Sequence, residues 1–310
     1  MNAVETPRML RPSERTNPRE GSVVWSPGKS LWIISFILIA GIGGYLTFRY
    51  DALLLTFACF VTTMCLGVSI GFHRLLVHRS FECSRWLEGA FIYLGTVAGM
   101  GGPLSFLYTH DLRDWSQRHE SCHPYLSHQN PLWRDFIWQF FCELRLTYPP
   151  RLQIEPRIAA NRFYRFLERT WLLQQLPWAL LFYALGGVSF VIWGIFVRIT
   201  FSMFVLYLAG CFAHNSGSRD WHLKGHAVQG HNVPYFGLLT MGESWHNNHH
   251  AFPGSARLGL CASQCDPGWW VLCALHAFGF VWNIKLPAHL PERPELAPVQ
   301  PPLTGMERAR

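Results

Sequence analysis

The clearest feature of the chain is a set of long stretches in which apolar residues are not interrupted by charges. Residues 31–48 and 52–72 each contain no charged residue, and only Arg49, Tyr50 and Asp51 separate them. Each stretch is close to the about 20 residues that an α-helix needs to cross the hydrocarbon core of a bilayer. The pattern therefore predicts a hairpin of two membrane-spanning helices.

A second pair of apolar stretches repeats this arrangement later in the chain. Residues 171–197 and 199–213 contain no charged residue, and Arg198 between them is the predicted turn. A buried helix of a soluble protein is the alternative for any one stretch, but four stretches in two pairs favour the bilayer. We therefore predict an all-α integral membrane protein with four transmembrane helices in two hairpins.

Two further apolar stretches are predicted to lie at the membrane surface. Residues 87–108 are rich in glycine and are interrupted by Pro103, which favours a partly embedded or surface helix over a fifth span. Residues 268–282 are short for a span and have two tryptophans near their start, which is typical of an interfacial helix.

The basic residues predict which side of the membrane the polar segments occupy. Residues 1–30 carry five Lys or Arg and residues 73–170 carry twelve Arg, whereas the two predicted turns carry only Arg49 and Arg198. Basic residues near the ends of spans favour the cytosolic side. We therefore expect a cytosolic helical cap, made from residues 73–170 and 214–290, that holds the active site.

The composition agrees with a membrane protein. Half of the 310 residues are hydrophobic and only 15% are charged, compared with about a quarter in average soluble proteins. The net charge is +7, but the basic residues lie beside apolar spans, so we attribute them to membrane topology and expect no nucleic acid partner. Residues 1–30 are predicted to be mostly disordered, residues 31–290 to form the membrane domain, and residues 291–310 to form a proline-rich tail.

Histidine provides the candidate chemistry, because 13 of the 15 histidines lie between His73 and His250. The strongest group is His246, His249 and His250, where spacings of three and four residues place side chains on one face of a helix. His250, beside His249, is then able to address a second, neighbouring metal. Three histidines within five residues predict a metal site, since imidazole binds iron, zinc and copper.

The other histidines are weaker signals when each is taken alone. His73 and His78 lie about 140° apart on an α-helix, so they share one metal only if the helix is distorted or the metal lies between them. His214 ends the fourth predicted span, where a snorkelling polar residue is the alternative to a ligand. Histidines from several helix ends at a membrane surface predict a nitrogen-rich polynuclear site, for which iron with O2 is the natural pairing.

Three motifs resemble the membrane-bound fatty acyl desaturases, in particular the Δ9 acyl-CoA branch. The similarity is carried by GFHRLLVHRSF (71–81), GGP (101–103) ending seven residues before His110, and GESWHNNHHAFPGSARLGL (242–260), and it continues in DPGWW and VWNIKLP. The resemblance extends over about residues 30–290. It implies a four-span fold with a cytosolic cap, a non-haem centre of two iron ions, O2 as co-substrate and an external electron donor.

The middle motif departs from the family pattern. The family's His-x-x-His-His falls on His110, Arg113 and Asp114, and a family asparagine that reaches the metal through water falls on Gly210. Arginine cannot ligate a metal, because its guanidinium stays protonated. Asp114 is therefore expected either to supply an oxygen ligand or to pair with Arg113 or Arg118.

Three further histidines of the middle segment are candidates to replace the lost ligands: His119, His123 and His128, of which we favour His123. Glu243 is expected to fix the tautomer of a ligand histidine, although a plain helix-terminal carboxylate is equally compatible with the sequence. The predicted metal ligands are nine residues: His73, His78, His110, Asp114, His123, His214, His246, His249 and His250.

The sequence leads to three functional hypotheses. The first is an O2-dependent desaturase that introduces a cis double bond, at Δ9, into a long-chain saturated acyl-CoA, with acyl-lipid and acyl-carrier-protein substrates left open. The second is a membrane di-iron hydroxylase. The third is a non-catalytic metal-binding or transport protein. The predicted spans argue against it, because they contain no charged residue and ion pathways usually do. No His-Pro-Gly-Gly haem-binding motif occurs in the sequence, so a separate ferredoxin or cytochrome b5-like donor is expected. A bacterial inner membrane and an endoplasmic reticulum both fit.

Overall fold

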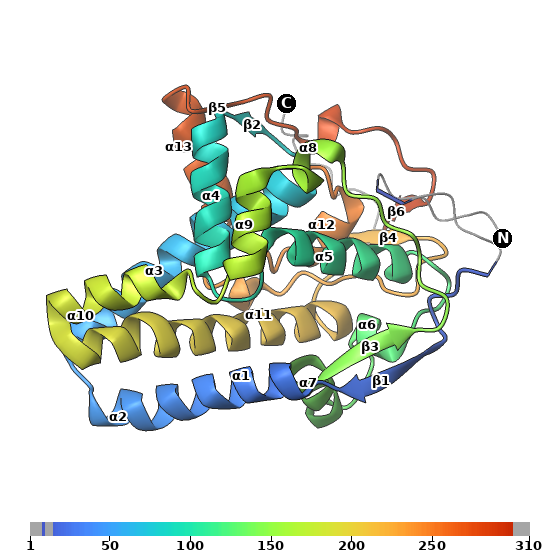
Figure 1. Cartoon of the computed structure of the whole chain (residues 1–310). Helices are drawn as coiled ribbons and strands as arrows, with labels where there is room; N and C mark the ends of the chain where they lie inside the picture. Colours follow the sequence, from blue (N-terminus) through green and yellow to red (C-terminus); the bar gives the residue numbers. More distant parts are fainter. Residues whose placement is uncertain (1–7, 10–14, 300–310) are drawn as a thin grey trace.

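The structure is a computed structural model that describes residues 8–9 and 15–299. It is mostly helical, and the described residues also form three small two-stranded antiparallel sheets. Three helical stretches are long and apolar enough to cross a membrane: Pro27–Leu46, Tyr50–Val77 and Gln175–Asn215. In Figure 1 the long helices lie side by side in the lower part of the molecule, and shorter helices cover one part of them.

The first hairpin agrees with the predicted apolar stretches. Its first arm comprises α1 (Pro27–Leu38), the π-helical segment η1 (Ile39–Gly43) and α2 (Gly44–Leu46). After the turn at residues 47–49, the second arm comprises α3 (Tyr50–Thr62) and the π-helical segment η2 (Thr63–Val77). Pro27 stands at the start of the first helix, where its missing N–H is not needed for a helical hydrogen bond.

The second hairpin contradicts the predicted turn at Arg198. The helices here are α10 (Gln175–Val191), η3 (Ile192–Val197) and α11 (Arg198–Asn215), and the backbone leaves the helical conformation at Gly187, with φ 68° and ψ −156°. Figure 1 shows that the chain reverses between α10 and α11. A Cβ atom on Gly194 would lie only 2.7 Å from the ring of Phe182, so the two arms are closely packed.

Arg198 is instead buried inside the second arm, with 2% of its surface exposed. Its guanidinium donates hydrogen bonds to Gly194 O at 2.8 Å and Val97 O at 3.0 Å, and to side-chain oxygens of Thr63 and Gln175 at 3.2 Å each. From the sequence, this charge inside an apolar stretch is interpreted as a turn. In the structure, acceptors from its own and from neighbouring helices satisfy the hydrogen bonds of the buried guanidinium.

The two hairpin turns lie next to each other. Arg49 Nη1 donates a hydrogen bond to Gly186 O at 3.2 Å, and Ser189 Oγ donates one to Thr47 O at 2.7 Å. In Figure 1 both turns are at the left end of the helices. The opposite ends of α3–η2 and α11 therefore point toward the same part of the molecule, where the histidines gather.

Shorter helices pack around these ends. They are α4 (Arg85–Val97), α5 (Pro103–Gln117), α6 (Pro124–Ser127), α7 (Leu132–Phe141), α8 (Pro156–Ala159), α9 (Arg162–Thr170), α12 (His246–Ala251) and α13 (Pro267–Ala277), with short 3-10 turns η4 (Pro234–Phe236) and η5 (Pro287–His289). The predicted helix within residues 87–108 thus breaks between α4 and α5. α4 crosses η2 at backbone contact, because a Cβ on Gly67 would lie 2.5 Å from Gly95 N.

The small sheets correct the predictions for the two ends of the chain. β1 (Gly21–Trp25) pairs with β3 (Cys142–Leu146), so the predicted disorder of residues 1–30 is wrong for this segment. β4 (Trp221–Leu223) pairs with β6 (Leu296–Pro298), and β2 (Glu82–Cys83) with β5 (Val281–Trp282). Other parts of these predictions fall on residues 1–7, 10–14 and 300–310, which lie outside the described residues.

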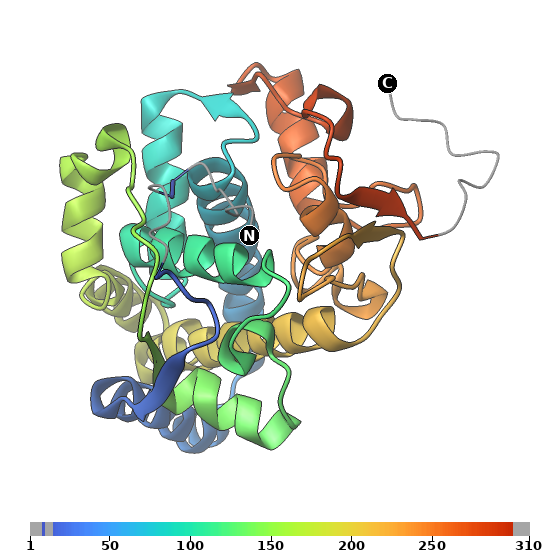
Figure 2. The same ribbon diagram turned by 90° about the vertical axis from the view of Figure 1, so that its right-hand side faces the viewer.

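The α3–η2 helix is the centre of the fold. Figure 2 shows it between α4 and α9 on one side and the C-terminal segment with α13 on the other. Its buried apolar side chains, such as Phe60, Met64 and Val68, form one core cluster with Phe91 of α4 and Leu272 of α13. This packing fixes the end of η2 against segments that are distant in the sequence.

Candidate metal centre

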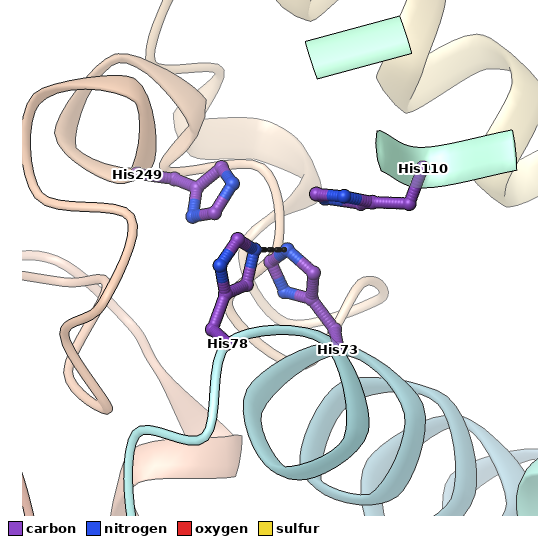
Figure 3. A group of neighbouring side chains, drawn as sticks. All are labelled: His73, His78, His110 and His249. Atoms are coloured by element: carbon purple, nitrogen blue, oxygen red, sulfur yellow. Dashed lines mark hydrogen bonds between the residues drawn. The ribbon is translucent and has the colours of Figure 1, made fainter. Parts of the chain in front are cut away.

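Four histidines from three parts of the chain form what we call the first cluster: His73, His78, His110 and His249. Each offers a ring nitrogen, and these nitrogens all lie within 4.8 Å of one another. Figure 3 shows the four imidazoles turned toward a common space, two from the end of η2, one from α5 and one from α12.

The π-helical geometry of η2 explains how His73 and His78 meet. The amide N–H of His78 donates to the carbonyl of His73 at 3.1 Å, a bond between residues five apart. A π-helix has more residues per turn than an α-helix, so residues five apart lie nearly on one face. The Nε2 atoms of His73 and His78 are 3.2 Å apart. The helix distortion that would allow His73 and His78 to share one metal is therefore present.

Three further histidines form the second cluster: His214, His246 and His250. His214 is near the end of α11, while His246 and His250 are one helical turn apart on α12. The Nε2 atom of His246 lies 3.1 Å from that of His214 and 2.9 Å from that of His250. Of the two pairings that the spacing left open, the structure has His246 with His250, and His249 lies in the first cluster.

These nitrogen positions fit metal binding. Two nitrogens bound at about 2.0–2.1 Å to one ion are about 2.8–3.4 Å apart, and the Nε2 separations within the clusters are 2.9, 3.1 and 3.2 Å. Hydrogen bonds alone do not explain why three Nε2 atoms converge in the second cluster. His246 Nε2 lies close to two others, but one ring nitrogen either donates one proton or offers one lone pair. The Nδ1 atoms of His110 and His249 are buried and have no hydrogen-bond partner among the described residues.

The electrostatic environment keeps four of the clustered histidines neutral, which is the form that ligates metals. Burial, reinforced by neighbouring histidines, lowers the pKa of His78, His249 and His250 well below the usual value. The same causes lower the pKa of His246 to about 3. Lone pairs are therefore available at neutral pH.

Glu243 lies against the first cluster. Its Oε2 is 2.5 Å from His73 Nδ1, and its Oε1 accepts a hydrogen bond of 2.5 Å from Ser69 Oγ. Arg74 Nε is 3.8 Å from the same carboxylate and Arg74 also pairs with buried Asp266 at 2.7 Å. A carboxylate at Nδ1 leaves the Nε2 lone pair of His73 for a metal. This contact favours the tautomer-fixing role over that of a plain helix-terminal carboxylate.

Two of the nine predicted ligands are not part of either cluster. Asp114 forms an ion pair of 2.7 Å with Arg118, one turn later on α5, which is the alternative that the sequence left open. His123 begins α6, where its Nδ1 accepts a hydrogen bond of 3.2 Å from the backbone N–H of Tyr125. His123, the favoured replacement ligand, thus lies outside both clusters and caps a helix.

The segment that follows α5 instead brings His128 next to the second cluster. The rings of His128 and His214 are stacked, with centroids 5.1 Å apart. His128 Nδ1 is 2.8 Å from Asp135 Oδ2, and its Nε2 is in contact with Arg113 Nη1. Because Asp135 and Arg113 use both ring nitrogens, His128 is not available as a ligand in this arrangement.

Two buried residues near the clusters were missed by the sequence analysis. Arg8 donates to Asp111 Oδ2 at 3.2 Å and to Val77 O at 2.8 Å, each next to a histidine of the first cluster. Gln117 lies at the second cluster, with its Nε2 3.1 Å from His214 Nε2. Nothing in the sequence around Arg8 indicates its contacts, whereas Gln117 follows His110 by two helical turns and was detectable from that spacing.

The comparisons with known proteins agree with these motifs. The model of the family described as "Fatty acid desaturase" matches residues 51–260, more than half of the chain. The chain belongs to the fatty acid desaturase family. This confirms the resemblance, and family membership together with the apolar helices makes the chain a membrane protein of that family.

Similar curated proteins come from plants and cyanobacteria. An "Acyl-CoA C20 Delta5-desaturase" of Anemone leveillei is 32% identical over 255 residues, covering 80% of this chain and 78% of the relative. An "sn-1 stearoyl-lipid 9-desaturase" of Anabaena variabilis is 34% identical over 221 residues, covering 71% and 79%. A "Palmitoyl-monogalactosyldiacylglycerol delta-7 desaturase, chloroplastic" of Arabidopsis thaliana is 34% identical over 249 residues, covering 78% of this chain but only 64% of the relative.

Proposed function

We propose that this desaturase-family protein introduces a cis double bond, at Δ9, into a long-chain saturated acyl-CoA. The observation that carries the proposal is the convergence of seven histidines into two adjacent clusters, in a chain matched by the fatty acid desaturase model. The relatives include enzymes named for acyl-CoA and for acyl-lipid substrates and for different bond positions. The acyl carrier and the bond position are therefore the parts of the proposal that most need measurement.

We assign the iron ligands from the clusters. The four histidines of the first cluster would hold one iron and the three of the second cluster the other, since imidazole is a ligand of iron that supports redox chemistry. When bound, iron and O2 supply the oxidant that removes one hydrogen from each of two adjacent methylenes. The reaction takes two electrons from the substrate and two from an external donor, and it reduces O2 to two water molecules.

The protein's own residues prepare this site. Glu243 keeps the proton of His73 on Nδ1, and burial keeps His249 and His250 in their neutral form. The role of the surrounding side chains is to exclude water and to hold one methylene pair against the metals.

A cavity between the cap and the long helices supports an apolar substrate. Its volume is about 200 Å³, and it lies between α3–η2, α4 and the second hairpin. Apolar side chains such as Ala58, Leu94, Trp178 and Phe182 line it, together with the buried Arg198. Such a lining suits part of a saturated hydrocarbon chain.

We further propose that the protein crosses the membrane four times with the clusters on the cytosolic side. The Gln175–Asn215 stretch has 41 residues, about twice the length needed for one crossing, and it is interrupted at Gly187. The excess of arginine in residues 73–170 favours the cytosol for the segment that carries His110. An electron donor on that side, a ferredoxin or a cytochrome b5-like protein, completes the proposed reaction.

The test is fatty-acid profiling, with localisation of double bonds by mass spectrometry, in a desaturase-deficient host. Wild type is expected to produce cis-Δ9 chains, and His249→Ala is expected to produce none. His222→Ala is the matched control, because His222 is exposed on β4 and belongs to neither cluster. A product that has gained an oxygen instead of losing two hydrogens would replace the desaturase with the hydroxylase. Unsaturation that persists in His249→Ala would remove the clusters from the reaction.

A further inference from the structure

Gln117 is a buried glutamine at the wall of the second cluster, with 3% of its surface exposed. It ends α5, seven residues after His110, so both side chains lie on one face of that helix, two turns apart. His110 belongs to the first cluster, and Gln117 lies beside His214 of the second. One helix therefore borders both clusters, with a ligand histidine at one and an amide at the other.

The orientation of the Gln117 amide follows from its second contact. Nε2 donates a hydrogen bond of 2.7 Å to Leu126 O and lies 3.1 Å from His214 Nε2. Exchanging the two ends of the amide would place Oε1 against the carbonyl oxygen of Leu126, with no hydrogen between them. The side chain therefore presents an N–H to His214 and not a ligand oxygen.

His214 receives this hydrogen bond on the nitrogen that a metal needs. Its Nδ1 is 2.6 Å from Gly210 O, and a carbonyl only accepts, so the ring proton is on Nδ1. The lone pair of neutral His214 is then on Nε2. A metal in the second cluster and the amide of Gln117 compete for that one lone pair.

The second cluster also differs from the first in its charged surroundings. Arg113 lies on α5 between His110 and Gln117, and its guanidinium contacts His128 and donates to Gln139 Oε1 at 3.2 Å. His128 in turn stacks on His214. A cation held at this place disfavours a divalent metal ion, and the carboxylate of Asp135, 2.8 Å from His128 Nδ1, offsets part of that charge. The first cluster has one more imidazole and the carboxylate of Glu243 in contact with it.

We propose that Gln117 acts as a hydrogen-bond lock on His214 that weakens metal binding at the second cluster by about tenfold, so that this cluster fills after the first. Tenfold corresponds to the loss of about one hydrogen bond when the metal displaces the amide. Gln117 is a positioning residue in this proposal and touches no substrate. The inference rests on the proposed metal-binding role of both clusters, but not on the reaction that they perform.

The experiment is a Co²⁺ titration of the full-length, metal-free protein in detergent, with free Co²⁺ set by a chelator and bound metal counted by mass spectrometry. Wild type is expected to bind one ion and then a second at free Co²⁺ at least about tenfold higher. In Gln117→Leu the second step is expected at about tenfold lower free Co²⁺, with the first unchanged. Gln174→Leu is the control, because Gln174 is also buried but donates to Thr170 Oγ1.

Two further variants assign the steps. His250→Ala is expected to remove the weaker step and His249→Ala the tighter one. Gln117→Met, which keeps the side-chain length without the donor, replaces Gln117→Leu if that variant does not fold. Two ions bound in a single step by wild type, or a second step that Gln117→Leu leaves unchanged or weakens, would overturn the proposal.

The readout separates this inference from the proposed reaction. A protein that binds two ions in the expected order but makes no unsaturated product contradicts only the desaturase function. A protein in which neither cluster binds Co²⁺ contradicts both.

Discussion

Glu243 lies outside the clusters but is in direct contact with His73, a candidate ligand. Burial by itself raises the pKa of Glu243, but the interactions with His73, Arg74 and Ser69 outweigh it and lower the pKa. The carboxylate is therefore ionised and ready to accept the Nδ1 proton of His73. Outer carboxylates of this kind hold the ring in place and raise the basicity of the ligand nitrogen.

Glu243→Gln is expected to weaken metal binding at the first cluster by about tenfold or more, since the amide removes the charge that stabilises the Nδ1 proton. The free Co²⁺ concentration at half-saturation of the first cluster measures the effect. Glu143→Gln serves as the control, because Glu143 is exposed on β3 and accepts only from Ser26 Oγ among the described contacts. Equal half-saturation in wild type and Glu243→Gln would show that the carboxylate does not support His73.

The buried neutral histidines make the stability of the metal-free protein depend on pH. The unfolded chain protonates each histidine below about pH 6.5, whereas burial and neighbouring histidines hold the pKa of His246 at about 3 in the folded protein. Between these values the unfolded state binds more protons than the folded state. The free energy of unfolding therefore falls as pH falls, by about 1 kcal/mol per pH unit for each such histidine.

We expect the thermal unfolding midpoint of the metal-free protein in detergent to decrease steadily from pH 7 to pH 5. His246→Asn is expected to show a shallower decrease, because asparagine does not titrate in this range. A midpoint that is independent of pH below 6.5, or the same slope in His246→Asn, would contradict neutral burial of these side chains.

At the scale of helices, the length of apolar stretches predicted the first hairpin well and the second hairpin only in part. The charge of Arg198 interrupted the second stretch, and a charge was taken as a turn. The actual reversal uses Gly187, whose φ of 68° and ψ of −156° are accessible mainly to glycine. The carbonyls that accept from Arg198 come from α4 and from its own helix, and contacts between distant segments are not visible in a hydropathy pattern.

The close crossing of η2 and α4 depends on glycine. A Cβ on Gly67 would lie 2.5 Å from the backbone of Leu94 and Gly95, and one on Gly71 would lie 2.6 Å from Phe91 O. Backbone atoms do not move aside as the end of a flexible side chain does. Because η2 contains His73 and is capped by His78, a shift of η2 also displaces two candidate ligands of the first cluster.

Gly67→Ala is therefore expected to destabilise the protein by about 1–3 kcal/mol, the usual cost of overpacking, and to lower the metal content of the first cluster. The thermal unfolding midpoint and bound Co²⁺ are the two measurements. Gly41→Ala is the matched control, since Gly41 is also in a long apolar helix but has no atom within 4 Å of an added Cβ. If Gly67→Ala is as stable and as fully loaded as Gly41→Ala, the two helices are not in backbone contact.

At the scale of the whole molecule, the sequence predicted the seven clustered histidines but not the surroundings of the second cluster. His246, His249 and His250 were found from local spacing, which a helix converts directly into geometry. The sequence did not predict the placement of His123 and His128, because it depends on where the segment after α5 turns. That segment uses His123 as a helix cap and places His128 between Arg113 and Asp135, and tertiary contacts of this kind have no periodic signature.

The two ends of the long helices are far enough apart to lie on opposite sides of a bilayer. The turns are joined by hydrogen bonds from Arg49 to Gly186 O and from Ser189 to Thr47 O, so both belong to one end. Along α3–η2, His73 lies about 35 Å from Tyr50 at the α-helical rise, which is enough to cross the about 30 Å of a hydrocarbon core. The first cluster is therefore one membrane thickness away from the turns.

An epitope tag inserted after Arg49 is accordingly expected to be cleaved by protease from outside intact bacterial cells whose outer membrane has been removed. A tag inserted after Glu120, in the segment that follows α5, is expected to be cleaved only after the inner membrane is opened, because arginine-rich segments stay in the cytosol. The untagged chain provides the control for nonspecific cleavage. Cleavage of both tags from the same side would mean that the long helices return without crossing, and the clusters would then not face the cytosol opposite the turns.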